Sequence, residues 1–234
     1  MVALPFALAR WHIEPAAWPF VAISSLIEVI YFGLLVAAYQ RAHMSLVYPI
    51  ARGSAPVFVL LVAVLLLGAP TSAGQVAGVA LVGLGVVLVR GLRGATGHWP
   101  HVALALAVGI SIAAYTVVDK EGIRYADPIA YVTLILGLPG IVAVAWVAAR
   151  GGADRLRRAI TPAAIAGGIF SITAYALVLI ALTQAPAASV AAVRESSVVI
   201  AAILGVFVLR ERAGPMRVLG ALVVAAGVAL VVAA

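Results

Sequence analysis

The chain of 234 residues is too apolar to fold as a soluble domain. Apolar residues make up 65% of it and charged residues only 10%, whereas soluble domains average about 45–50% and about 25%. With a mean hydropathy of +1.21, this composition excludes a soluble globular domain, a disordered chain and a nucleic-acid-binding domain. The net charge of +7 therefore indicates basic loops beside a lipid bilayer. The absence of cysteine excludes disulfides and thiol chemistry.

Long apolar runs predict eight full membrane-spanning helices. Each run is close to the roughly 20 residues that a helix needs to cross a bilayer core. The predicted bounds are 17–39, 45–67, 74–90, 102–119, 128–149, 162–182, 187–209 and 215–233. The run Met1–Ala9 lacks a basic start, so we expect an N-terminal half helix there and no signal peptide. Short segments with glycine, proline or charge, such as Arg150–Thr161, are predicted as loops.

The loop charges predict an orientation. Eight crossings assign ten cations to one side of the membrane and three to the other, and two more lie inside spans. The side with ten cations is expected to face the cytoplasm, which would leave the C-terminus outside.

The two halves of the sequence match each other as an internal repeat. At an offset of 142, Arg52 aligns with Arg194, Gly78 with Gly220 and Gly85 with Gly227. Five predicted spans separate the copies, and this odd number predicts that they are inverted in the membrane. The repeats are expected at 1–97 and 98–234. The first copy lacks one and a half helices, roughly 40 residues.

These segments resemble the drug/metabolite transporter superfamily of the EamA type. The resemblance rests on Tyr48–Pro56, on Val193–Val199, on the turn Leu209–Arg212 and on the glycine-spaced runs 74–90 and 215–233. It implies a fold of ten helices in two inverted five-helix repeats, of which this chain lacks the first one and a half. It also implies cytoplasmic termini, which is opposite to the loop charges. Where the family often has an acidic residue after its fourth helix, this chain has Ala69, whereas Glu211 keeps that residue in the second copy.

Four charged residues are predicted inside spans, namely Glu28, Arg52, Arg194 and Glu195. A charge at mid-membrane costs at least about 2.5–3.5 kcal/mol, so each is a functional candidate. Arg52 and Arg194 are expected at mirror depths, where their forked donors could clamp a carboxylate. Alternatively, Arg52 pairs with Glu28, and Arg194 with a nearby acid, to hold helices together. Glu28 or Glu195 could carry a proton during a transport cycle.

Hydroxyl-bearing residues complete the candidate site. The predicted substrate-binding residues are Glu28, Tyr31, Tyr48, Arg52, Tyr115, Tyr175, Arg194, Glu195 and Ser196. By contrast, Asp119, Lys120 and Glu121 are predicted to form a solvated loop edge. The spaced glycines of 74–90 and 215–233 are expected to pack against helices of the same chain, in preference to a second copy.

These patterns predict an all-α secondary active transporter of a small amphipathic metabolite, amino-acid-like or anionic, that works by alternating access. We expect a multi-pass protein in a bacterial-type plasma (inner) membrane, with the lipid bilayer, the metabolite and protons as candidate partners, and no nucleic acid. No nucleophile–base pair or metal-ligand spacing is found, so neither an enzyme, a cofactor nor a metal is predicted. The alternative is a non-transporting membrane module, either a truncated remnant or a subunit that needs a partner chain.

Overall fold

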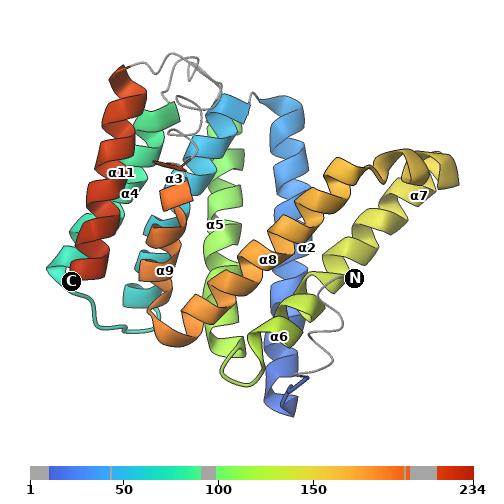
Figure 1. Cartoon of the computed structure of the whole chain (residues 1–234), viewed down its shortest axis with the longest axis horizontal. Helices are drawn as coiled ribbons and strands as arrows, with labels where there is room; N and C mark the ends of the chain where they lie inside the picture. The colour runs from blue at the N-terminus through green and yellow to red at the C-terminus, as the bar shows by residue number, and fades with distance from the viewer. Residues whose placement is uncertain (1–10, 43, 91–98, 198, 201–214) are drawn as a thin grey trace. The chain divides into compact units, whose positions relative to one another are not determined.

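The described part of the chain is helical. The computed structural model describes residues 11–42, 44–90, 99–197, 199–200 and 215–234 (Figure 1). Its helices are η1 (Pro15–Ala17), α2 (Trp18–Arg41), α3 (Met44–Leu65), α4 (Ala73–Arg90), α5 (Trp99–Gly122), α6 (Pro128–Ile135), α7 (Gly137–Ala159), α8 (Pro162–Gln184), α9 (Ala187–Arg194) and α11 (Pro215–Ala233). Within these residues the only β-pairing is an isolated bridge between Ile13 and Ala126.

Among the described residues, five segments are long and apolar enough to cross a membrane. They are Pro15–Arg41, Leu46–Leu65, Trp99–Gly122, Pro128–Gly152 and Pro162–Gln184. Two shorter helices, Ala73–Leu88 and Val218–Ala233, are also apolar. These lengths support a multi-pass membrane protein, although they do not establish the predicted number of eight spans. The predicted N-terminal half helix, the end of the span 187–209 and the turn Leu209–Arg212 lie outside the described residues.

Proline does not interrupt α3, which runs through Pro49 and Pro56 as predicted. The span predicted at 128–149, however, is divided into α6 and α7 at Leu136. The reason lies one turn further on, because Pro139 has no N–H to donate to the carbonyl of Ile135. The segment Pro128–Gly152 is long and apolar enough to cross a membrane, as predicted, but two helices form it.

The predicted loop Arg150–Thr161 is also largely helical. Helix α7 continues to Ala159 and is broken only at Gly152, which has φ 65° and ψ −172°. This backbone conformation suits glycine, which has no Cβ. Thr161 then caps α8, because its hydroxyl accepts a hydrogen bond of 3.1 Å from the Ala164 N–H.

The helices form two compact units. The first contains the described residues up to Phe32 together with Val118–Gln184, and the second contains Gly33–Val117 and the described residues from Ala185 onward. In the first unit α6 packs against α7 and α8, and in the second α4 packs against α3, α9 and α11. Each candidate site below lies inside one of these units.

The first unit is tied together by the turn between α5 and α6. Asp127 caps α6, with its side chain accepting hydrogen bonds from the Ile129 and Ala130 N–H groups. Its own N–H donates to the His12 carbonyl at 2.9 Å. The ring of Phe20 stacks on that of Tyr125 at a centroid distance of 5.9 Å. These bonds hold the start of α2 against the turn.

The second unit is built around the contact between α4 and α11 (Figure 1). A Cβ on Gly78 would lie 2.8 Å from the Gly227 carbonyl oxygen, and a Cβ on Gly85 would lie 2.8 Å from that of Gly220. The backbones approach this closely because none of these four positions has a side chain. The expectation that the spaced glycines pack within the chain is confirmed.

Candidate functional site

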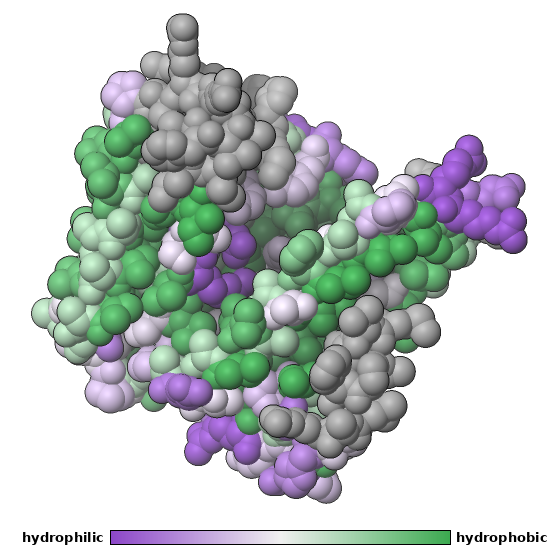
Figure 2. Space-filling model, viewed as in Figure 1, coloured by the Kyte–Doolittle hydropathy of each residue, from purple (hydrophilic) through white to green (hydrophobic). Residues whose placement is uncertain are grey.

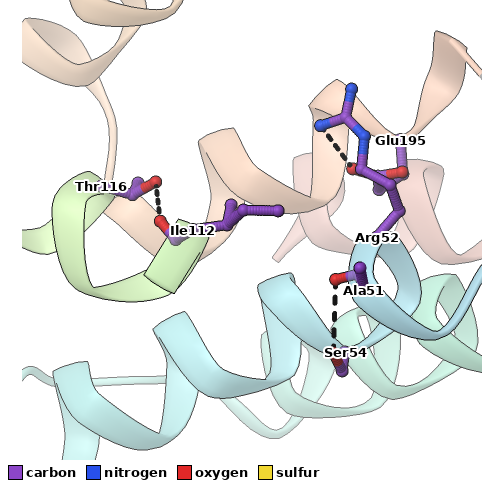
Figure 3. A network of polar contacts seen from close by, with 6 residues as sticks. All are labelled: Ala51, Arg52, Ser54, Ile112, Thr116 and Glu195. Atoms are coloured by element: carbon purple, nitrogen blue, oxygen red, sulfur yellow. Dashed lines mark hydrogen bonds and ion pairs between the residues drawn. The ribbon is translucent and has the colours of Figure 1, made fainter. Parts of the chain in front are cut away.

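The second unit brings a buried acid and an arginine together. Arg52 on α3 and Glu195 at the end of α9 form an ion pair, with 3.6 Å between Nη1 and Oε1 (Figure 3). The Glu195 side chain is only 3% exposed and that of Arg52 is 27% exposed. The structure thus pairs Arg52 with Glu195, whereas the alternative interpretation of the sequence paired it with Glu28.

One carboxylate oxygen of Glu195 is left without a partner. Oε2 is buried and has no hydrogen-bond partner among the described residues. An unsatisfied buried acceptor is rare and costly, because it has lost its water without gaining a donor. Such an atom is available to a hydroxyl or an ammonium group that enters the site.

Two tyrosines border the arginine. The Tyr48 ring, one turn before Arg52 on α3, lies 5.8 Å from the guanidinium carbon, within cation–π range. Tyr115 on α5 is 4% exposed and interacts with Arg52 electrostatically. Both were predicted site residues, and the structure places them around the same charge.

Close packing of α3 and α5 fixes the position of this group. A Cβ on Gly109 of α5 would lie 2.9 Å from the Ala51 carbonyl oxygen, and the Ser54 hydroxyl donates to that same oxygen at 3.3 Å. On α5 the Thr116 hydroxyl donates to the Ile112 carbonyl at 2.7 Å. Figure 3 shows both bonds beside the ion pair. Pro56 has no N–H for the Arg52 carbonyl, which weakens the backbone ladder of α3 at the site.

The predicted residues Arg194 and Ser196 flank the paired acid. Helix α9 ends at Arg194. Glu195 follows in a tight turn, and its backbone N–H donates to the Ala192 carbonyl. Glu195 interacts electrostatically with Arg194 as well as with Arg52. Ser196 is half-buried at the start of the next helical residues. The two arginines aligned by the repeat therefore both interact with one carboxylate.

The first unit contains a second polar cluster, which the sequence analysis placed wrongly. Asp119 was predicted at a solvated loop edge, yet it lies inside α5 and is fully buried. One of its oxygens accepts a hydrogen bond from the Tyr131 hydroxyl at 3.2 Å, and the other accepts one from the Tyr175 hydroxyl. Gly122 lets the Tyr131 ring approach α5, because a Cβ there would overlap the ring.

Tyr175 was a predicted site residue, whereas Asp119 and Tyr131 were not. The spacing of Tyr115 and Asp119, one turn apart, was the available signal for a polar face on α5. Asp119 was nevertheless assigned to a loop edge, because the apolar run ends near it. The structure extends the helix to Gly122, and the Asp119 carboxylate is buried where it meets the hydroxyls of Tyr131 and Tyr175.

The remaining predicted residues lie on α2 in the first unit. Glu28 is 3% exposed, and Ser24 and Tyr31 lie about one turn before and after it. The Ser24 hydroxyl is buried without a partner among the described residues. Tyr31 is half-buried and meets Phe32 edge-on at 5.0 Å. These side chains form a polar face on an otherwise apolar helix.

A small cavity opens where α5 and α8 end. It has a volume of about 280 Å³ and is lined by Lys120, Glu121, Ile123, Arg124, Leu182 and Thr183. Lys120 donates to the Leu182 carbonyl, and Arg124 pairs with Glu121 at 2.9 Å. These charged side chains therefore bond to other residues of the cavity wall. None of the predicted site residues lines the cavity. Across the described residues, no three acidic or histidine side chains gather closely enough to hold a metal ion.

The family comparison covers nearly the whole chain. The profile of the EamA-like transporter family matches residues 1–91 and 99–233. The chain belongs to the EamA-like transporter family. It is therefore a multi-pass membrane protein of the drug/metabolite transporter superfamily, and its family is one of membrane transporters.

Structural comparison agrees with this membership at the level of the fold. One solved structure, titled only "Crystal structure of protein", aligns with a TM-score of 0.76 and covers 98% of this chain and 81% of its own. The sequence identity is 18%, so the likeness concerns the fold alone. Comparison with curated proteins finds no match.

Proposed function

We propose that this EamA-like protein is a secondary active transporter of a small amphipathic metabolite, and that Arg52 and Glu195 contact the substrate. The observation that carries the proposal is the buried carboxylate of Glu195, which holds Arg52 with one oxygen and has no donor for the other among the described residues. A charged pair among apolar helices is costly, and in membrane proteins such residues mark substrate pathways.

The chemistry of the pair favours an amino-acid-like or anionic substrate. The part-exposed guanidinium of Arg52 offers forked donors that suit a carboxylate. The unpartnered oxygen of Glu195 suits an ammonium or hydroxyl group on the same molecule. Tyr48 and Tyr115 supply aromatic faces and hydroxyls beside the charges. A substrate with one acidic and one donor group would satisfy both members of the pair.

The packing of α4 on α11 supports an inverted duplication with repeats at 1–97 and 98–234. The repeat alignment equates Gly78 with Gly220 and Gly85 with Gly227. The observed contacts join Gly78 to Gly227 and Gly85 to Gly220, so each contact is the image of the other under that alignment. This is the relation that a two-fold axis between inverted repeats would produce. Inverted repeats suit alternating access, in which one repeat moves against the other.

Transport by the purified chain in proteoliposomes tests the proposal. A panel of amino acids and organic acids should contain a substrate whose uptake Arg52→Gln lowers about ten-fold or more, the value of a lost charged hydrogen bond. Arg52→Lys keeps the charge without the fork and should recover part of the uptake. Arg41→Gln, which removes an exposed arginine at the end of α2, serves as the control. If wild type and Arg52→Gln take up every compound equally, Arg52 has no part in binding, and the non-transporting membrane module becomes the better account.

The same proposal places the protein in a bacterial-type plasma membrane. The Arg-rich loops support this location because positive charge is retained on the cytoplasmic side. A cysteine introduced at an exposed site near α8, such as Thr161→Cys, gives the orientation directly. In right-side-out vesicles a membrane-impermeant thiol reagent should not label it, whereas in inverted vesicles it should.

A further inference from the structure

The link between α7 and α8 concentrates positive charge at one point on the chain. This basic link, residues 150–161, contains four arginines and one aspartate, a net charge of +3. It begins in the last residues of the apolar segment Pro128–Gly152 and precedes Pro162–Gln184, and both segments are long enough to cross a membrane. The link therefore lies where two spanning segments leave the same face of the bilayer. In Figure 2, hydrophilic side chains gather at the tip where α7 meets α8.

The backbone of the link is largely helical. Helix α7 breaks at Gly152 and resumes to Ala159. Arg157 and Arg158 are exposed on the resumed turn, and the Arg158 Nε donates to the Asp154 carbonyl at 3.3 Å. Leu156 is half-buried, and Ile160, one turn later, is 61% exposed. A short helix with arginines and one apolar edge suits the boundary between headgroups and acyl chains.

A tryptophan marks the depth of the first arginine. The guanidinium carbon of Arg150 lies 4.5 Å from the centroid of the Trp146 ring, and that ring is 47% exposed. Exposed tryptophan rings in membrane proteins favour the headgroup level. If Trp146 lies at that level, its stacking contact would hold the Arg150 guanidinium close to the lipid phosphates.

We propose that the basic link binds the phosphate groups of anionic phospholipids. The charge is complementary, and arginine forks match phosphate oxygens. Clusters of basic residues beside a spanning helix bind anionic lipid headgroups more strongly with each added charge. Lipid bound here would hold the ends of α7 and α8 against the membrane surface. This binding does not depend on which substrate the protein transports.

Native mass spectrometry of the full chain in detergent, titrated with phosphatidylglycerol or phosphatidylcholine, tests this proposal. The wild type should retain phosphatidylglycerol in preference to phosphatidylcholine. The triple variant Arg150→Gln, Arg157→Gln, Arg158→Gln should lose most of that preference, since each arginine near an anionic surface is worth about five-fold in binding. The matched triple variant with lysine at these positions should keep most of it, because its charge is unchanged.

Two further experiments test whether the basic link is the binding site and whether the bound phosphate belongs to a lipid. Arg41→Gln combined with Arg124→Gln removes exposed cations elsewhere and should leave the preference intact. Soluble glycerol phosphate should not displace phosphatidylglycerol at equal concentration. Equal lipid preference in wild type and the glutamine triple variant would overturn the proposal, as would complete competition by glycerol phosphate. Circular dichroism of each variant verifies that it is folded.

Discussion

Two buried carboxylates have different surroundings, and the difference suggests different roles. Asp119 has a phenol hydroxyl on each oxygen, so its hydrogen-bonding capacity is used to join α5, α6 and α8. Glu195 has an arginine on one oxygen, and the described part of the chain supplies no hydrogen-bond partner for the other. We infer that the Asp119 cluster stabilises the first unit, and that Glu195 binds a ligand.

Replacing Asp119 should therefore affect stability. Asp119→Asn keeps the shape but weakens both tyrosine bonds, and hydrogen bonds to a charged group contribute about 1.5–3 kcal/mol each. We expect a clear fall in the melting temperature measured by scanning fluorimetry in detergent. Glu121→Gln, on the same helix but part-exposed, is the control and should melt close to the wild type. An unchanged melting temperature in Asp119→Asn would show that the two tyrosine bonds contribute nothing.

A different measurement tests Glu28 as a proton carrier. It is buried on the polar face of α2, where a carboxyl group could gain and lose a proton during transport. Glu28→Gln removes the titratable group, so uptake driven by a pH gradient should disappear while exchange without a gradient continues. Ser25→Ala, also on α2 and buried, controls for local repacking. If the pH dependence of uptake persists in Glu28→Gln, another group carries the proton.

At the scale of elements, hydropathy located the helices better than it located their interruptions. The ends of α4 and α11 agree closely with prediction because apolar runs stop at charge, glycine or a cap. At α4 this cap is a reciprocal pair, in which Ser72 and Gln75 exchange backbone-to-side-chain bonds. The break at Leu136 was missed because Pro139 acts on a carbonyl one turn earlier, in a run of unchanged hydropathy.

The glycine contact between α4 and α11 gives a prediction at this scale. A Cβ at residue 85 would lie 2.6 Å from the Val224 nitrogen and 2.8 Å from the Gly220 carbonyl oxygen. Backbone atoms cannot rotate away, so Gly85→Ala should destabilise the chain by about 1–3 kcal/mol, as overpacking generally does. Gly33→Ala meets no atom within 4 Å and should be neutral or slightly stabilising. Equal thermal stability of the two variants would contradict the close packing described here.

For the whole molecule, composition predicted the membrane class, the resemblance of particular segments indicated the family, and the structure added the partners of the charged residues. Arg52, Arg194 and Glu195 were recognisable because charge is rare inside apolar runs. Their pairing was not, because pattern alone does not say which two distant helices are neighbours. The Asp119 cluster was missed for a related reason, since its donors come from two other helices, with Tyr131 12 residues and Tyr175 56 residues away in sequence.

The central claim is that the pair of Arg52 and Glu195 binds substrate in addition to joining α3 and α9. Exchanging the two charges, with Arg52→Glu and Glu195→Arg combined, separates these roles. Either single change leaves like charges together and should lower stability by about 3–5 kcal/mol, as breaking a buried pair does. The double variant restores an ion pair and should recover much of that loss, as measured by scanning fluorimetry.

Uptake by the charge-exchanged double variant in proteoliposomes is the most direct measurement. We predict that it recovers stability but not transport, because the forked donor and the unpartnered carboxylate oxygen have changed places relative to Tyr48 and Tyr115. Recovery of both stability and uptake to wild-type values would contradict the account and reduce the pair to a structural contact between α3 and α9.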